Sequence, residues 1–275
     1  MVKLAFWDTV NAAYRYVFAR PLTVLRAGWL YLLIGAIHFS FRKNEPFEPG
    51  PVLAASVVTI LLIAASIAWH IALFRAILLN EQTWSAAVQF RRRHWRMVGV
   101  GLLLFLILVP APAVVAGVGV VLVHIGGPAA IGGVLIIVVA VTAVVIVASR
   151  FYLLGPAIAT DDPAKAIRAA WRRSHGNTFR LFFGGVLMIL PAAIVLAVVG
   201  GGAGLLLFVA IGGGVPLDEW MMQLGFASRV VIGLLQTIVQ LVVGALSIAF
   251  YALAYKQLAP NWNPPAALAA TQLDT

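Results

Sequence analysis

Cysteine is absent from the 275 residues of this chain, and acidic residues are scarce. Without thiols, the chain forms no disulfide, no thiolate metal site and no cysteine nucleophile. Only nine carboxylate side chains occur, and none lies inside the long apolar stretches. Ion-coupled transporters commonly carry buried carboxylates as proton or sodium relays, so this distribution counts against that mechanism. It also leaves few candidates for an active site built from paired carboxylates.

Familiar catalytic and nucleotide-binding motifs are missing as well. The chain has no GxSxG, no HExxH and no Asp/His cluster with metal-ligand spacing, so neither a metal nor a cofactor is expected. The glycine run 200–204 lacks the Lys-Ser/Thr pair of a P-loop, and we expect it to break a helix or to allow close helix packing. Residues 1–20 lack the apolar core of a cleavable signal peptide.

Apolar residues, by contrast, dominate the sequence. They make up 63% of it, charged residues make up 10%, and the mean hydropathy is +1.02. Soluble domains average about 45–50% apolar and about 25% charged residues. A membrane-spanning helix needs about 20 mostly apolar residues. Six stretches qualify, at Leu22–Phe41, Val52–Phe74, Met97–Val123, Ala129–Ala148, Phe179–Val199 and Val230–Leu253.

The predicted fold class is therefore all-α, a polytopic transmembrane helical bundle of about six spans. We expect residues 1–258 to form a single integral membrane domain, followed by a short polar tail at 259–275. Between spans five and six, the segment 200–228 is interpreted as a short apolar excursion with an interfacial part.

Basic residues fall mainly on one side of these spans. Sixteen of the nineteen Lys and Arg residues lie in the N-terminal segment, in the loops after spans two and four, or after span six, and three lie on the other side. Positively charged loops stay in the cytoplasm. The sequence therefore predicts that these loops, and both termini, are cytoplasmic.

Three short amphipathic segments accompany the basic parts of the chain. Each is basic or polar on one side and apolar or aromatic on the other, which is typical of helices that lie in the membrane interface. The first has Phe6, Val10, Ala13 and Val17 on its apolar side, and the third has Ala164, Ile167, Trp171 and Ser174 on one face. The second, with Trp84, Ala87, Val88 and Trp95, is a poorer stripe that Arg91 interrupts.

The order of elements indicates a three-fold repeat of helical hairpins, with units at 3–79, 83–158 and 163–258. At a spacing of 81 residues, Phe90–His94 (FRRRH) lies over Trp171–His175 (WRRSH). Repeats of this kind occur in membrane folds. Chance similarity in a biased composition is the alternative interpretation.

Two groups of candidate site residues emerge. The arginines of the basic loops are candidates for binding anionic lipid headgroups, where each charge contributes about 1 kcal/mol near an acidic leaflet. They are Arg91, Arg92, Arg93, Arg172 and Arg173. The alternative is that these charges only fix orientation during insertion. Nucleic acid is not expected as a partner, because no basic domain projects away from the membrane.

The second group consists of polar residues inside predicted spans. His70 is either a proton carrier or ligand, or the partner of a helix–helix hydrogen bond. Gln236 and Gln240 lie four residues apart on one face of span six. Buried amides commonly hold helices together in bilayers, at about 0.6 kcal/mol per interaction. The alternative for this pair is a polar pore lining.

The segment Ala166–Phe182 (AIRAAWRRSHGNTFRLF), preceded by Arg150 and by Gly155-Pro156-Ala157, resembles a recurring segment of certain bacterial six-helix inner-membrane proteins. These families are related to the membrane domain of glycerophosphoryl diester phosphodiesterase. The resemblance implies a six-helix protein of the bacterial inner membrane. The hydrolase activity in that family belongs to a separate soluble barrel, so the resemblance supplies no catalytic residue.

Three functional hypotheses follow. The leading one is a non-enzymatic integral membrane protein that associates with anionic lipids, or with a protein partner or further copies of itself. The second is a transporter or channel for a small or lipidic solute, with its site near His70, Gln236 and Gln240. The third is a lipid-modifying enzyme, for which the sequence offers no acid–base pair.

Overall fold

Helices make up nearly all of the structure. The computed structural model describes residues 2–40, 49–81, 90–162, 166–191, 194 and 226–259, and within them no strand occurs. The helices are α1 (Phe6–Ala19), α2 (Pro21–Ser40), α3 (Pro49–Leu79), α5 (Arg92–Leu108), α6 (Pro110–Ile125), α7 (Gly127–Phe151), α8 (Leu154–Ala159), α9 (Ala166–Ser174), an unlabelled helix at Thr178–Pro191, and α12 (Phe226–Leu258). The predicted all-α class is confirmed.

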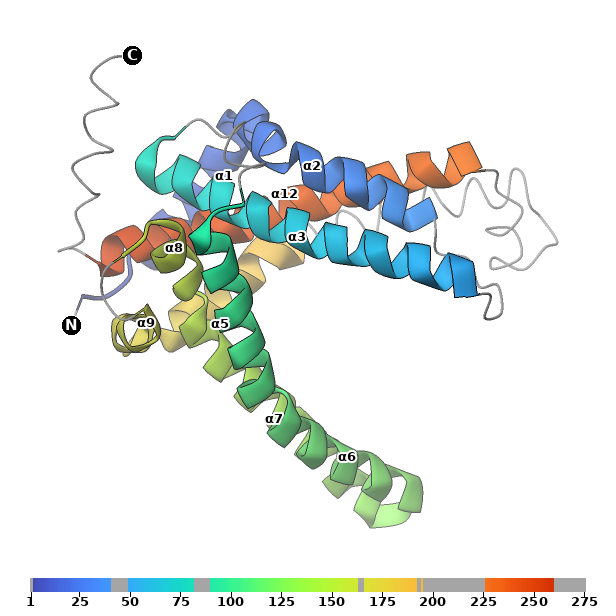
Figure 1. The fold of residues 1–275 in the computed structure, drawn as a ribbon. Coiled ribbons are helices and arrows are strands. Elements are labelled where there is room, and N and C mark those ends of the chain that lie inside the picture. The colour runs from blue at the N-terminus through green and yellow to red at the C-terminus, as the bar shows by residue number, and fades with distance from the viewer. Residues whose placement is uncertain are drawn as a thin grey trace.

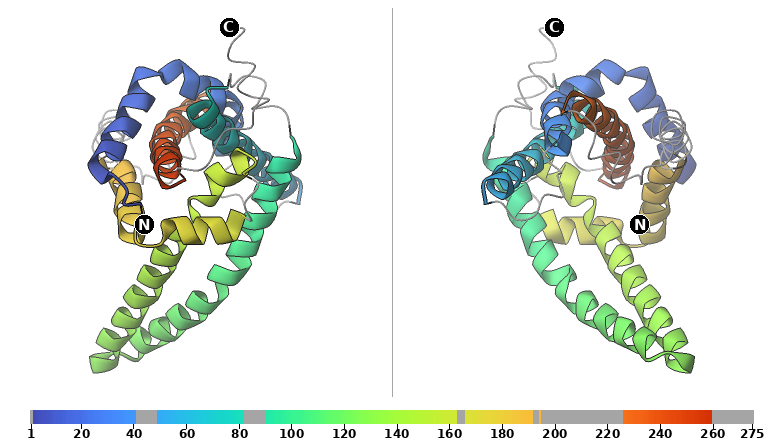
Figure 2. Two further views of the ribbon diagram at one scale, coloured as in Figure 1. Left: turned by 90° about the vertical axis from the view of Figure 1, so that its left-hand side faces the viewer. Right: turned by 90° about the vertical axis from the view of Figure 1, so that its right-hand side faces the viewer.

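Two arms leave a common junction (Figure 1). Helices α2, α3 and α12 lie side by side and form the first arm. Helix α6 continues in line with α5 and packs against α7, and these three helices form the second arm, which points in a different direction. The side views show the same separation (Figure 2). Helices α1, α8 and α9 lie at the junction.

The best-packed part of the molecule is this junction. Its core comes from α1, the last turns of α3, α8 and the last turns of α12, and its largest fully buried side chains include Phe250, Tyr255, Leu73 and Leu153. The outer parts of the arms keep their leucines and valines exposed, and only 11% of the most apolar 18-residue stretch within Gly127–Ala159 is buried. Hydrocarbon solvates such side chains, so helices in a bilayer need not bury them in protein.

Four of the described helices are long and apolar enough to cross a membrane, at Pro21–His38, Leu53–Leu79, Gly127–Ala159 and Val230–Leu258. They correspond to predicted spans one, two, four and six. A membrane-embedded helical protein is therefore supported, whereas six spans remain a prediction. The third and fifth predicted spans overlap the shorter apolar helices Pro112–Ile125 and Thr178–Pro191.

Predicted span three is divided at Pro110. α5 ends at Leu108, and α6 begins at Pro110 with Val109 as the shared cap. Proline has no N–H to donate, and its ring clashes with the preceding turn, so it interrupts a helix. The hydrogen bonds of Val109 to Phe105 and of Ala113 to Val109 continue across the break, which makes it a kink.

The amphipathic stripe of α1 exists as predicted, but it faces protein. Val10, Ala13 and Val17 are buried, and α1 packs against α12. In α9, the deeply buried apolar residues are Ala169 and Ala170, whereas the predicted stripe residues Ile167 and Trp171 are about 40% exposed. The residues Val10, Ala13 and Val17 of α1 therefore form part of the junction core.

Several predictions fall outside the described residues. These are most of the second amphipathic stripe (Trp84, Ala87 and Val88), Ala164 of the third, the glycine run 200–204, the end of predicted span five and almost all of 200–228, and the tail 260–275. The three-fold repeat is not confirmed. Its matched histidines differ in environment, because His94 is buried and His175 is exposed.

Candidate functional site

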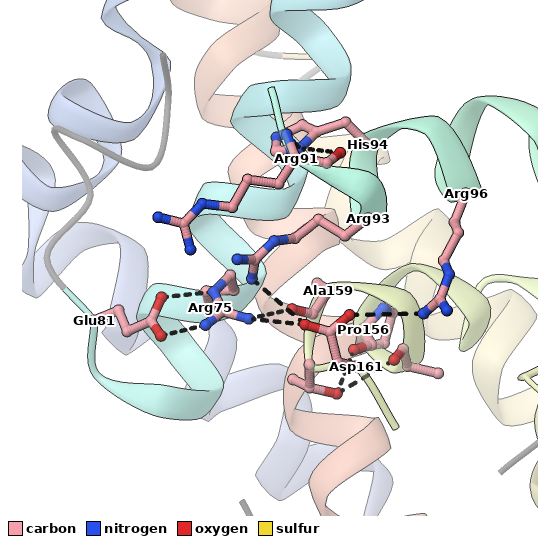
Figure 3. Close-up of polar contacts among 11 residues, drawn as sticks. Arg75, Glu81, Arg91, Arg93, His94, Arg96, Pro156, Ala159 and Asp161 are labelled. Atoms are coloured by element: carbon pink, nitrogen blue, oxygen red, sulfur yellow. Dashed lines mark hydrogen bonds and ion pairs between the residues drawn. The ribbon is translucent and has the colours of Figure 1, made fainter. Parts of the chain in front are cut away.

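The basic segments of the chain meet at the junction of the two arms. Arg75 comes from the last turns of α3, Arg93 and Arg96 come from the first turns of α5, and Asp161 follows α8 (Figure 3). We call these four residues together with Glu81 the arginine junction. Three arginines and two carboxylates leave this cluster with a surplus of positive charge.

Local backbone geometry fixes the position of Asp161. The chain leaves α8 with the Asp162 N–H donating to the Ala157 carbonyl and the Asp161 N–H donating to the Ile158 carbonyl, which is the Schellman pattern. This pattern places Asp161 in the left-handed region, with φ of 52°. Aspartate tolerates this region better than most residues. Its carboxylate is thus held on a rigid turn.

Arg75 is fully engaged. It forms a two-pronged ion pair with Glu81, and its Nη1 donates to the Ala159 carbonyl at 2.7 Å. The side chain is only 7% exposed. A buried charge needs such partners, because burial without them carries a large desolvation penalty. Arg75 therefore ties the end of α3 to α8 and has a structural role.

Arg93 and Arg96 are paired only loosely. Each has an Nη1 atom 3.8 Å from a carboxylate oxygen of Asp161, which is beyond hydrogen-bond length. The Arg93 side chain is 11% exposed, and its Nη1 is buried without a hydrogen-bond acceptor. Burial, with the nearby Arg75 charge, lowers the pKa of Arg93 although Asp161 opposes this. Its charge is therefore under-compensated.

Arg173 provides the contrast. Its Nη1 donates to Oδ2 of Asp162 at 2.7 Å and to the Tyr255 hydroxyl at 2.9 Å, and the Tyr255 hydroxyl also donates to that carboxylate. Burial alone would lower the pKa of Arg173, but Asp162 and Tyr255 raise it above the ordinary value. This closed pair joins α9 to α12, and its geometry is that of a structural contact.

The remaining candidate arginines are Arg91, Arg92 and Arg172, and all three are exposed. At the start of α5, the Arg91 backbone N–H donates to Nδ1 of the buried His94 at 2.9 Å. Burial lowers the pKa of His94, so the neutral ring that can accept this bond is favoured. The histidine therefore caps the helix that carries Arg92 and Arg93.

The segment that carries the family resemblance has a structural task that the sequence pattern does not reveal. Gly176 has a φ of 76°, which favours glycine, and Asn177 begins the next helix by accepting from the Leu181 N–H. The Asn177 amide accepts from the Leu4 N–H at 2.9 Å and donates to the Val2 carbonyl at 3.0 Å. Arg180 donates to the Leu4 carbonyl at 2.7 Å. The motif clamps the N-terminal segment.

Replacing Asn177 by Asp should loosen that segment. The carboxylate can still accept from Leu4, but it cannot donate to Val2 and repels its carbonyl oxygen, so we expect a loss of about 1–3 kcal/mol. Hydrogen–deuterium exchange should show faster exchange of α1 amides. His175→Gln, at the exposed neighbouring position, is the control and should leave α1 unchanged. Equal exchange in Asn177→Asp would contradict the clamp.

The intramembrane candidates are not brought together into one site. Nδ1 of His70 lies 2.7 Å from the Ser66 carbonyl one turn earlier in α3, so this bond is within one helix. Gln240 accepts from the Tyr31 hydroxyl at 3.0 Å, which is a polar contact between α12 and α2 of the predicted helix-joining kind. Gln236 is exposed on α12.

The arrangement defines an all-helical, membrane-embedded chain whose basic segments converge at one end and hold an under-compensated guanidinium. Among the described residues, no group of three or more metal-ligating side chains gathers. Because the Nη1 of Arg93 is buried without a hydrogen-bond acceptor, the junction can bind an anion. No protein-family model matches the chain, and no curated protein or solved structure matches it either.

Proposed function

We propose that this chain is a non-enzymatic, multi-pass protein of the bacterial inner membrane that binds anionic lipid headgroups through its basic junction. The observation that carries the proposal is the buried Arg93 Nη1, which has no hydrogen-bond acceptor beside a carboxylate too distant to supply one. Phosphate oxygens accept short, charge-assisted and frequently two-pronged hydrogen bonds from a guanidinium. The kinship with the six-helix families named above is part of the same proposal.

The placement of the basic segments supports a cytoplasmic orientation of the junction. The N-terminal segment contacts Asn177 and Arg180, and Arg75 contacts the turn after α8, so three basic parts of the chain share one end of the molecule. The positive-inside rule assigns that end to the cytoplasm. Reporter fusions at His94 and Asn177 that report an outside location would contradict this orientation.

Neutralising the basic loops should abolish selective retention of acidic lipid. We expect the purified wild-type chain to keep phosphatidylglycerol over phosphatidylcholine. A variant with Arg→Gln at 91, 92, 93 and 172 should lose about tenfold or more of that preference, because each charge contributes about 1 kcal/mol. Arg173 is left intact in this variant, because it forms the structural pair with Asp162. Lipid extraction and native mass spectrometry measure this. The matched control carries Arg→Gln at the exposed residues 15 and 20, outside the candidate set. Equal lipid content in all three samples would overturn the proposal.

A transporter or channel remains the second candidate, and the observation that favours it is Gln236. Gln236 is exposed in the first third of the apolar helix α12, where contact of its amide with hydrocarbon is costly. A solute path or a neighbouring copy of the chain would satisfy it. Liposome flux that falls in Gln236→Leu would support transport, whereas flux equal to that of empty liposomes would argue against it.

A further inference from the structure

The arginine junction lies where the two arms separate. Helix α3 ends there and α5 begins there, and from this point they run in different directions (Figures 1 and 3). Both helices leave the junction with large exposed apolar side chains. On α3 these are Leu53, Val57, Ile60, Leu61 and Ile63, and on α5 they are Leu102, Leu103, Phe105 and Leu106.

Exposed aromatic rings lie next to the arginine junction, at the start of α5. Trp95 lies on α5 between Arg93 and Arg96 and is 67% exposed, and Phe90 directly precedes α5 and is 44% exposed. Tryptophan is enriched at the headgroup level of membranes. Exposed aromatic rings beside Arg93 and Arg96 are thus of the kind found at the depth of phosphate groups, and exposed apolar side chains follow them along α5.

Charge at the junction favours an added anion. Glu81 forms its ion pair with Arg75. Asp161 lies 3.8–3.9 Å from the guanidinium groups of Arg75, Arg93 and Arg96, which is too far for a hydrogen bond to any of them. The side chains of Arg96 and Asp161 are 52% and 48% exposed, so a ligand can reach them. A phosphate would supply the missing acceptor for Arg93 and would compete with Asp161 for both arginines.

We propose that the arginine junction binds the phosphate of one anionic phospholipid, which accepts hydrogen bonds from Arg93 and Arg96 while its acyl chains lie along the diverging arms. This inference rests on the proposed function and refines it from a basic surface to a single site. Asp161 is its built-in competitor. Because it repels the phosphate and holds the same arginines, removal of its charge should strengthen lipid binding.

Native mass spectrometry of the full chain in detergent, titrated with phosphatidylglycerol, tests the site. We expect Arg93→Gln with Arg96→Gln to weaken binding about tenfold or more, since two charge-assisted hydrogen bonds are lost. Asp161→Asn should tighten binding by about three- to tenfold. Asparagine also tolerates positive φ, so the turn is kept. Arg168→Gln, an exposed arginine of α9, is the matched control and should change affinity less than about twofold.

The outcomes separate the two proposals. Tighter binding by Asp161→Asn supports the site, and a misfolded protein cannot produce that gain. Unchanged or weaker binding overturns the single site, as does an equal loss in Arg168→Gln, although both leave lipid association intact. Glycerol phosphate that competes at the same concentration as the lipid would identify a site for soluble phosphate and would overturn the lipid assignment. No retention of phosphatidylglycerol by the wild type would overturn the proposed function itself.

Discussion

Substituting Asp162 by Asn is expected to cost about 3 kcal/mol of stability. The side chain of Asp162 is 5% exposed and that of Arg173 is 19% exposed, so loss of the carboxylate leaves a guanidinium buried without a counter-charge. Breaking a buried pair by removing one partner typically costs about 3–5 kcal/mol, and the partial exposure of Arg173 places this case at the lower end. Unfolding followed by circular dichroism in detergent measures the change.

Two further variants test whether the loss of stability comes from the ion pair between Asp162 and Arg173. Arg172→Gln removes a neighbouring arginine that is exposed, and it should alter stability by less than about 0.5 kcal/mol. The double variant Asp162→Asn with Arg173→Gln should be more stable than the sum of its single changes, because no unpaired charge remains. Additive losses would mean that the two side chains do not act as a pair.

The pairing of Arg173 with Asp162 could not be predicted from the sequence. Arg172 and Arg173 look equivalent in a basic run, and both were predicted to meet lipid headgroups. Successive residues of a helix point about 100° apart, so they face different surroundings. Of these two arginines, Arg173 is the one that bonds Asp162, and Tyr255, which completes the contact, lies 82 residues further along the chain. No local pattern predicts a contact of that separation.

The same reasoning separates the arginines of the other loop. Arg91, Arg92 and Arg93 formed one predicted group, yet only Arg93 has its guanidinium beside Asp161 and is only 11% exposed. Arg75 and Arg96, which were counted only for orientation, turn out to belong to the same cluster. The sequence contains one signal of this cluster: Asp161 is one of only nine acidic residues, against nineteen Lys and Arg, so an arginine cluster has few carboxylates with which to pair.

Properties that depend on composition alone were predicted well. Hydropathy located the four helices that are long enough to span a membrane. A spanning helix needs only a continuous run of apolar residues, which can be found along the sequence without knowledge of tertiary contacts. The charge count placed the basic segments at one end, where the structure gathers them. The apolar stripe of α1 was also correct, but periodicity does not say whether membrane or protein covers it, and here α12 does.

Substituting Gly133 by Ala should open the hairpin of α6 and α7. A Cβ atom at Gly133 would meet the Gly119 carbonyl oxygen and would lie 2.9 Å from the Val123 backbone nitrogen. Backbone atoms cannot rotate away as a side chain can, so the helices must separate. Such overpacking costs about 1–3 kcal/mol, and contact over two backbones places this case near the upper end. Thermal unfolding in detergent measures the loss.

The adjacent Gly132 supplies the matched control, because a Cβ atom there meets nothing within 4 Å. Gly132→Ala should therefore be neutral or should gain up to about 1 kcal/mol from the better helix propensity of alanine. Gly119→Ala tests the same contact from the other helix, since its Cβ would lie 2.8 Å from the Gly133 carbonyl oxygen. If α6 and α7 pack through these glycines, Gly119→Ala and Gly133→Ala are both destabilised while Gly132→Ala is not. Equal stability of all three variants would place the contact between these helices elsewhere.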